Sequence, residues 1–110
     1  MANAATTKEI QLPGFTLIEV EVTWDTVETF AVAHGGPENV EPLYVIHSLK
    51  TQGTDACVFA STMDLTNDEV DITILLENAG TLGTPVSKTL LFFPAGAGQD
   101  GQSINQDNNT

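Results

Sequence analysis

Alternation of apolar and polar residues along the chain predicts β-strands. The clearest example is the segment EVDITILL, in which Val70, Ile72, Ile74 and Leu76 fall on one face, the period-2 pattern of a half-buried strand. Farther along, Leu90–Phe93 is a continuous apolar run, long enough for a covered strand and too short for an ordinary helix. We expect these two strands, the richest in apolar residues, to be closed over by the others.

Five further strands follow from the same pattern, and turn residues separate them. The strongest alternation runs through Phe15–Trp24, with valine and isoleucine opposite glutamate and threonine, and Pro13-Gly14 marks the turn before it. About seven short strands and no convincing helix predict an all-β fold, a single antiparallel β-sandwich or small barrel with extended N- and C-terminal segments. The four remaining strands are expected at Lys8–Leu12, Val27–Ala33, Leu43–Leu49 and Ala56–Thr62.

The length of 110 residues and a hydrophobic content of 41% suit one domain with one core. We expect an N-terminal arm at residues 1–7, the β-sandwich at 8–94 and a low-complexity tail at 95–110 rich in Gly, Gln and Asn. The residues expected to form the core are Val20, Val22, Trp24, Ile46, Val58, Ile72, Ile74, Leu90 and Phe92.

The formal charge of −12 changes the range of plausible partners. Three lysines, no arginine and fifteen acids make nucleic-acid binding and an anionic membrane surface unsuitable. Such a charge fits a saline or extracellular setting, where salt weakens self-repulsion. Cys57 is alone, so no internal disulfide or thiolate metal cluster is expected, and a small buried side chain is the simplest interpretation.

Candidate chemistry is sparse, and we expect no enzyme, no catalytic residues and no cofactor. His34 and His47 stand outside any spaced ligand set, and the serines lack a nucleophile-elbow context. The acidic cluster Asp64–Asp71 contains oxygen ligands suited to calcium, but its spacing is not that of an EF-hand. A solvated acidic edge is the preferred interpretation, no metal ligand is assigned, and cation binding there stays an open alternative.

The segment Gly14-Phe15-Thr16-Leu17-Ile18-Glu19 resembles the processing site of type IV pilins and pseudopilins. In those proteins about twenty apolar residues follow the site and form a membrane helix. Here the following segment carries Glu21, Asp25 and Glu28. The resemblance therefore ends after six residues, and a strand is the better prediction.

Larger features of the chain resemble small structural proteins of tailed viruses. These features are the short polar N-terminus, the seven-strand domain, its final strand–glycine loop–strand segment (VDITILLENAG…TPVSKTLLFF) and the Gly/Gln/Asn-rich tail. The resemblance implies a virion structural protein, made in the host cytoplasm. It would be a head decoration or cement protein on the capsid exterior, a homo-oligomer bound to the major capsid protein or another virion protein.

Two alternatives remain open on the sequence. One is a tail or spike component of a virion, and the other is an extracellular β-sandwich module that binds carbohydrate or calcium. Sugar sites present exposed aromatic side chains, and we expect the two candidates for that role, Trp24 and Tyr44, to be buried in strands.

Partner contacts are expected at the two ends of the chain, because the outer strand faces elsewhere are acidic. An extended segment can add a strand to the sheet edge of a neighbouring molecule. The apolar anchors available for this are Ile10, Leu12 and Phe15 near the N-terminus and Ile104 in the tail.

Overall fold

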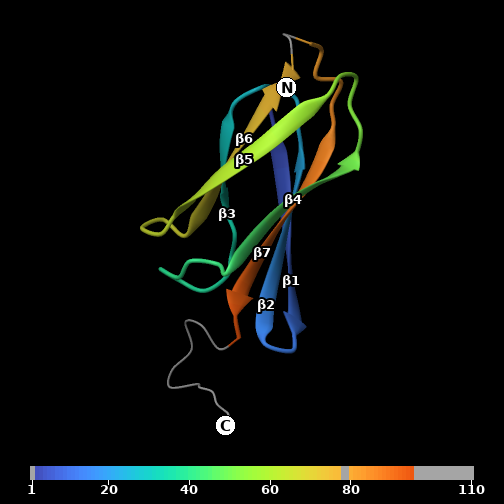
Figure 1. Cartoon of the computed structure of the whole chain (residues 1–110). Helices are drawn as coiled ribbons and strands as arrows, with labels where there is room; N and C mark the ends of the chain where they lie inside the picture. Colours follow the sequence, from blue (N-terminus) through green and yellow to red (C-terminus); the bar gives the residue numbers. More distant parts are fainter. Residues whose placement is uncertain (1, 78–79, 96–110) are drawn as a thin grey trace.

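The structure, a computed structural model, describes residues 2–77 and 80–95, and no α-helix occurs in this part of the chain. Seven strands form two sheets that face each other, all neighbouring strands being antiparallel (Figure 1). Sheet A has the order β1-β2-β7-β4 and sheet B the order β3-β6-β5. The prediction of an all-β antiparallel sandwich is confirmed. The strands are β1 (Ala4–Leu12), β2 (Phe15–Thr23), β3 (Thr29–Ala33), β4 (Tyr44–Thr51), β5 (Cys57–Asp64), β6 (Glu69–Leu76) and β7 (Val86–Pro94).

Two of the connections are hairpins within a sheet, and the others cross between the sheets. The β1–β2 hairpin turns at Gly14, whose φ of 83° lies in the left-handed region that glycine enters most easily. The connection from β6 to β7 crosses from sheet B to sheet A. The two strands richest in apolar residues thus lie inside opposite sheets, where each contributes one wall of the core.

The core lies between the two sheets and is built by the inward residues of the alternating strands. Trp24 and Phe93 are its largest fully buried side chains. Burying a valine, leucine or isoleucine side chain stabilises a fold by about 1.5–3 kcal/mol. The other buried members of the cluster are Ile18, Val20, Val22, Val32, Val70, Ile72, Ile74 and Leu91.

The sequence-based core is correct on β2 and β6 and wrong on β4, β5 and β7. Leu91 and Phe93 are fully buried, whereas Leu90 and Phe92 are half-buried on the outer face, because an unbroken apolar run does not reveal which face is inside. On β4 and β5 the inward positions belong to His47 and Phe59, so Ile46 and Val58 are exposed instead. The confirmed residues are Val20, Val22, Trp24, Ile72 and Ile74.

The predicted arm at residues 1–7 is mostly strand. β1 begins at Ala4, which pairs with Thr23, and the strand continues along β2 to Leu12. Asn3 is buried, and its Oδ1 accepts hydrogen bonds from the backbone N–H groups of Asp25 (2.6 Å) and Thr26 (2.9 Å). The domain therefore starts about five residues earlier than expected, because β-pairing does not require apolar side chains. The predicted tail lies, from residue 96 on, outside the described residues.

Candidate functional site

At the end of sheet A near the β1–β2 turn, the central strands β2 and β7 carry large apolar side chains on both faces. Their inner face belongs to the core, with Ile18, Leu91 and Phe93. On the outer face, strand register aligns Ile10, Leu17, Phe92 and Tyr44 as one row across all four strands. A second row, nearer the turn, joins Leu12 to Phe15 and Phe15 to Pro94. No strand of the described chain covers this face.

Three aromatic rings form the centre of this surface. The Phe15 ring lies 5.8 Å from the Phe92 ring and 6.1 Å from the Tyr44 ring, centroid to centroid. Together with Ile46 they line a shallow hollow of about 240 Å³. Tyr44 is 60% exposed and Ile46 47% exposed. We call this surface the apolar end of sheet A and define it as Ile10, Leu12, Phe15, Leu17, Tyr44, Ile46, Leu90 and Phe92.

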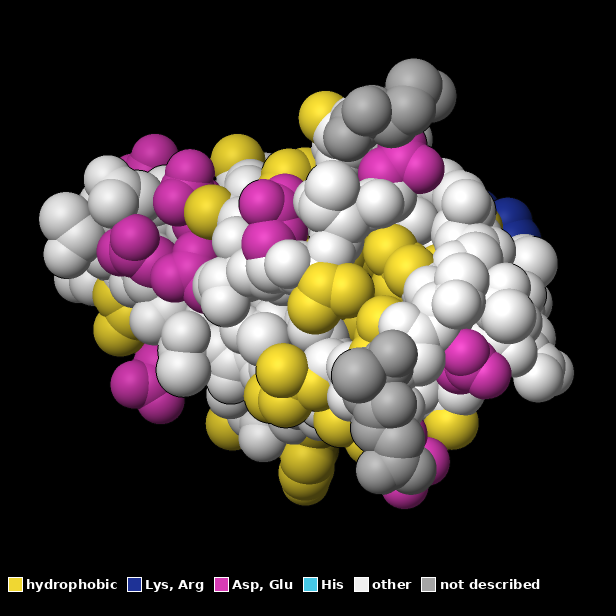
Figure 2. Space-filling model, turned by 90° about the horizontal axis from the view of Figure 1, so that it is seen from above, with side chains coloured by type: hydrophobic (Ala, Val, Ile, Leu, Met, Phe, Trp, Pro, Cys, Tyr) yellow, Lys and Arg dark blue, Asp and Glu magenta, His cyan; other side chains and the backbone are white. Residues whose placement is uncertain are grey.

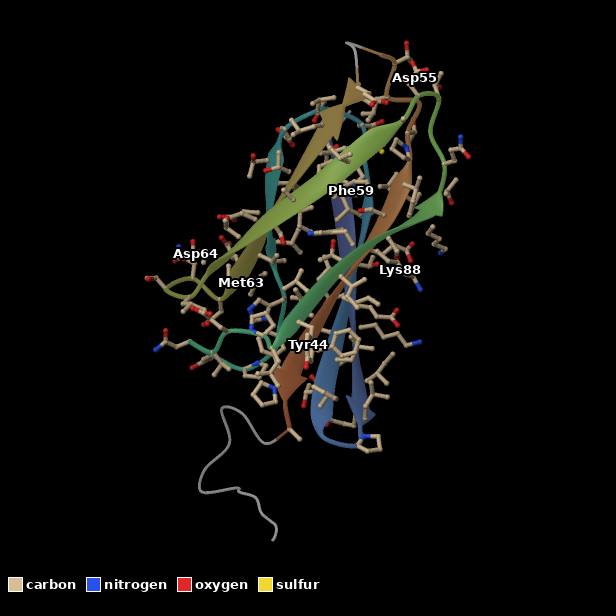
Figure 3. All side chains as sticks on the ribbon, viewed as in Figure 1. Tyr44, Asp55, Phe59, Met63, Asp64 and Lys88 are labelled. Atoms are coloured by element: carbon tan, nitrogen blue, oxygen red, sulfur yellow. The ribbon has the colours of Figure 1, made fainter. Side chains whose placement is uncertain are left out.

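The other end of the same outer face is charged. The Lys88 ammonium lies 3.3 Å from a Glu19 carboxylate oxygen, and the Lys50 ammonium lies 3.2 Å from Glu21. Lys8 pairs in register with Glu19 from the neighbouring strand β1. Figure 3 shows Tyr44 toward one end of sheet A and Lys88 toward the other.

This face carries all three lysines of the chain and only two glutamates, so its formal charge is +1. Of the other acids, the 11 that fall within the described residues lie elsewhere on the molecule, with no lysine or arginine among them. Figure 2, a view onto one end of the sandwich, shows acidic side chains spread over the surface and a cationic group only at one margin. The apolar end of sheet A therefore shares its face with all three lysines of an acidic protein.

His47 is the residue whose geometry most resembles a catalytic group. Its Nε2 lies 3.0 Å from the Ser61 hydroxyl on β5, and its Nδ1 lies 3.0 Å from the Thr89 hydroxyl on β7. The third partner is thus a hydroxyl, whereas a serine triad uses a carboxylate to stabilise the imidazolium. Burial lowers the pKa of His47, and its ring stacks on Phe59. These contacts describe a neutral side chain that links the edge strands of the two sheets.

His34 has a structural environment as well. Its side chain is 2% exposed, packs on the Phe93 ring, and its Nδ1 accepts a hydrogen bond from the Gly36 N–H at 2.9 Å. Burial lowers the pKa of His34, and the nearby Asp68 carboxylate opposes part of that effect. No nucleophile is among its hydrogen-bond partners in the described chain.

The acidic cluster Asp64–Asp71 does not converge on one point. The carboxylate of Asp64 accepts hydrogen bonds from the backbone and side chain of Asn67, which lower its pKa, and Asp68 accepts from the Asn39 N–H. Within residues 2–77 and 80–95, no three His, Cys, Asp or Glu side chains are grouped to hold a metal ion.

Cys57 is half-buried rather than fully buried, and burial raises the pKa of its thiol. It lines a second hollow, of about 390 Å³, together with residues from the adjacent ends of β5 and β6. The hollow has no polar side chain except Glu77 at its border.

Three of the sequence-predicted contact residues, Ile10, Leu12 and Phe15, lie together on the apolar end of sheet A. The fourth, Ile104, falls outside the described residues. The other five residues of this surface were not predicted. Ile46, Leu90 and Phe92 were expected in the core, Tyr44 was expected to be buried, and Leu17 was given no contact role. The sequence does contain one indication of such a surface, because large apolar residues fall on both faces of two predicted strands. These runs are Phe15-Thr16-Leu17-Ile18 and Leu90–Phe93.

Comparison with known proteins gives no relative: no family model, no curated protein and no solved structure matches the chain. Among the residues that the structure describes, no helix has the length and apolar character needed to span a membrane.

Proposed function

We propose that this protein is a non-enzymatic structural component of a virion, a head decoration protein that acts by docking against other proteins. The observation that carries the proposal is the cluster of aromatic rings on the outer face of sheet A. The apolar end of sheet A exposes aromatic and aliphatic side chains, with Tyr44 60% exposed, on a face that carries only two of the acids of a strongly acidic protein. Contiguous exposed apolar surface on a small domain is typical of protein–protein contact sites.

Two further features support a role outside the DNA-filled interior. The high negative charge repels phosphate backbones, and the described histidines are engaged in neutral structural contacts. The same acidity maintains solubility and keeps unrelated acidic surfaces apart at high local concentration. Both properties suit a protein present in many copies on the outside of a shell.

The carbohydrate-binding alternative gains one argument from the structure, since Tyr44 is exposed beside two other aromatic rings. The hollow they form is lined otherwise by Phe15, Ile46 and Phe92, and its lining presents no polar group. Sugar recognition needs several polar groups that orient hydroxyls. Protein docking therefore fits this surface better.

The test is to locate the protein in virus particles purified from its source. We expect mass spectrometry to find it at stoichiometric abundance and immunogold labelling to place it on the head. Labelling confined to the tail would replace head decoration by the tail or spike alternative. Absence from the particles, or saturable binding on a glycan array that Tyr44→Ala abolishes, would overturn the proposal.

A further inference from the structure

We propose that the outer face of sheet A is a self-association surface, on which a second copy of this chain docks face to face. The inference deepens the proposed docking role and rests on it, because it names the partner of the same surface. It follows from three properties of that face: its low net charge, the apolar residues at one of its ends and the size of the sheet.

Charge selects the face. Two copies that meet through an acidic surface bring acids against acids, because the 11 acids of the described residues outside this face have no lysine or arginine among them. Contact through sheet A instead joins two surfaces of formal charge +1, each with internal lysine–glutamate pairs. Like charges placed opposite each other oppose association. The outer face of sheet A is thus the self-contact with the least repulsion.

Size permits a stable contact. Strands of eight or nine residues and a spacing of about 4.8 Å give the four-stranded sheet a footprint of roughly 30 by 19 Å, on the order of 570 Å² before side-chain relief is counted. A standard interface buries about 800 Å² per partner. A face-to-face contact of the whole sheet approaches that size, and sheets pack in this way inside β-sandwiches.

The distribution of residues along the strands determines the symmetry. The apolar end must meet the apolar end, which requires a two-fold axis that runs parallel to the strands between β2 and β7. An axis across the strands would place the apolar end on the charged end. With the parallel axis, β1 of one copy lies over β4 of the other, so Ile10 faces the partner's Tyr44. The same rotation sets Lys88 opposite the partner's Glu21, so opposite charges meet.

The first experiment measures association of the full chain by sedimentation equilibrium over a concentration series. We expect a monomer–dimer equilibrium that strengthens when salt is raised above about 0.15 M, because screening reduces repulsion between two acidic molecules while apolar contact is retained. A chain that stays monomeric at all concentrations and salt levels overturns the inference. That result would leave the head-decoration proposal untouched, because the particle experiment tests it independently.

Matched variants locate the surface. Ile46→Glu and Val58→Glu each add an acid at an exposed apolar position of an edge strand, 47% and 62% exposed, on sheets A and B respectively. We expect Ile46→Glu to weaken the dimer by about tenfold or more, equivalent to 1.4 kcal/mol, and Val58→Glu to leave it unchanged. Equal loss in both variants, or loss only in Val58→Glu, overturns the assignment to sheet A.

Cross-linking tests the axis. In a Cys57→Ala background, chains with Ile10→Cys and chains with Tyr44→Cys are mixed and treated with a short thiol cross-linker. We expect the mixed dimer to dominate, and circular dichroism to confirm that each variant is folded. Efficient cross-linking of Ile10→Cys to itself, with no mixed product, contradicts the two-fold axis parallel to the strands.

Discussion

The indole N–H of Trp24 donates a hydrogen bond of 2.9 Å to the Ser87 hydroxyl inside the core, where the two side chains are 0% and 1% exposed. The Trp24 ring also packs on Phe30 and Phe59, which belong to the opposite sheet. The bond therefore fixes the orientation of the side chain that spans the interior. The Ser87 hydroxyl supplies the hydrogen-bond acceptor that the indole N–H of a buried tryptophan requires.

Ser87→Ala is expected to destabilise the fold by about 1–3 kcal/mol, because it leaves the buried indole N–H without an acceptor. Urea unfolding followed by fluorescence measures this, and Trp24 is the chain's one tryptophan, so the signal reports the core directly. Ser48→Ala is the control, since Ser48 is exposed and donates to a backbone carbonyl on the strand surface. Equal effects of the two substitutions would contradict a special role for the buried bond.

Asn3 connects the start of β1 to the turn after β2. Besides accepting from Asp25 and Thr26, its Nδ2 donates to Glu28 Oε2 at 2.7 Å. We expect Asn3→Ala to reduce the free energy of unfolding by about 1–3 kcal/mol, because two backbone N–H groups lose their acceptor. Thr6→Ala, an exposed change on the same strand, should have little effect. Wild-type stability in Asn3→Ala would show that the Asn3 hydrogen bonds do not stabilise the fold.

Gly83 is required by a close approach between two loops. Its φ is 69°, and a Cβ there would collide with the backbone N and side chain of Thr54, whose own N–H donates to the Leu82 carbonyl at 3.2 Å. Gly14 has a similar φ of 83° but open space around it. Gly14→Ala should therefore reduce the free energy of unfolding only by the cost of a left-handed conformation at alanine, about 1–2 kcal/mol. Gly83→Ala should reduce it clearly more, because the collision adds to that cost. Thermal unfolding compares them, and equal losses would mean that the loops separate without cost.

Most strand positions could be predicted from the sequence where a strand has one polar and one apolar face. Val70, Ile72 and Ile74 illustrate this, with buried and partly exposed residues alternating along β6. The pairing of strands into two sheets could not be predicted, since it depends on which connections cross between sheets. β1 was shortened in the prediction because its first residues, Ala4–Thr7, have no apolar pattern.

The candidate surface was missed for a related physical reason. Where both faces of a strand are apolar, alternation no longer distinguishes the core from a contact surface. Leu90 and Phe92 were assigned inward, although Leu91 and Phe93 fill the core. The partner-contact prediction at Ile10, Leu12 and Phe15 came from their place near a chain end. Their neighbours across the sheet, Tyr44 and Phe92, can be assigned to the same surface only when the strand register is known.

The two histidines give stability a dependence on pH. Burial lowers the pKa of both His34 and His47 below the ordinary value of 6.5. Their neutral forms therefore favour the folded state. The contribution is fully present above the unfolded pKa near 6.5 and is lost as pH falls from there through the lowered folded pKa, because the unfolded chain binds more protons. Each histidine can add a slope of at most about 1.4 kcal/mol per pH unit.

His34 should dominate this effect, since its Nδ1 accepts the Gly36 N–H and a proton there would remove that bond. His47 contacts two hydroxyls, which can accept from a protonated ring. Urea unfolding between pH 7.5 and 5.5, above the range in which carboxylates titrate, is expected to show stability falling toward acid. His34→Gln should flatten that slope more than His47→Gln, whatever its effect on absolute stability. A slope that persists unchanged in the double variant would assign the pH dependence to the acidic surface instead.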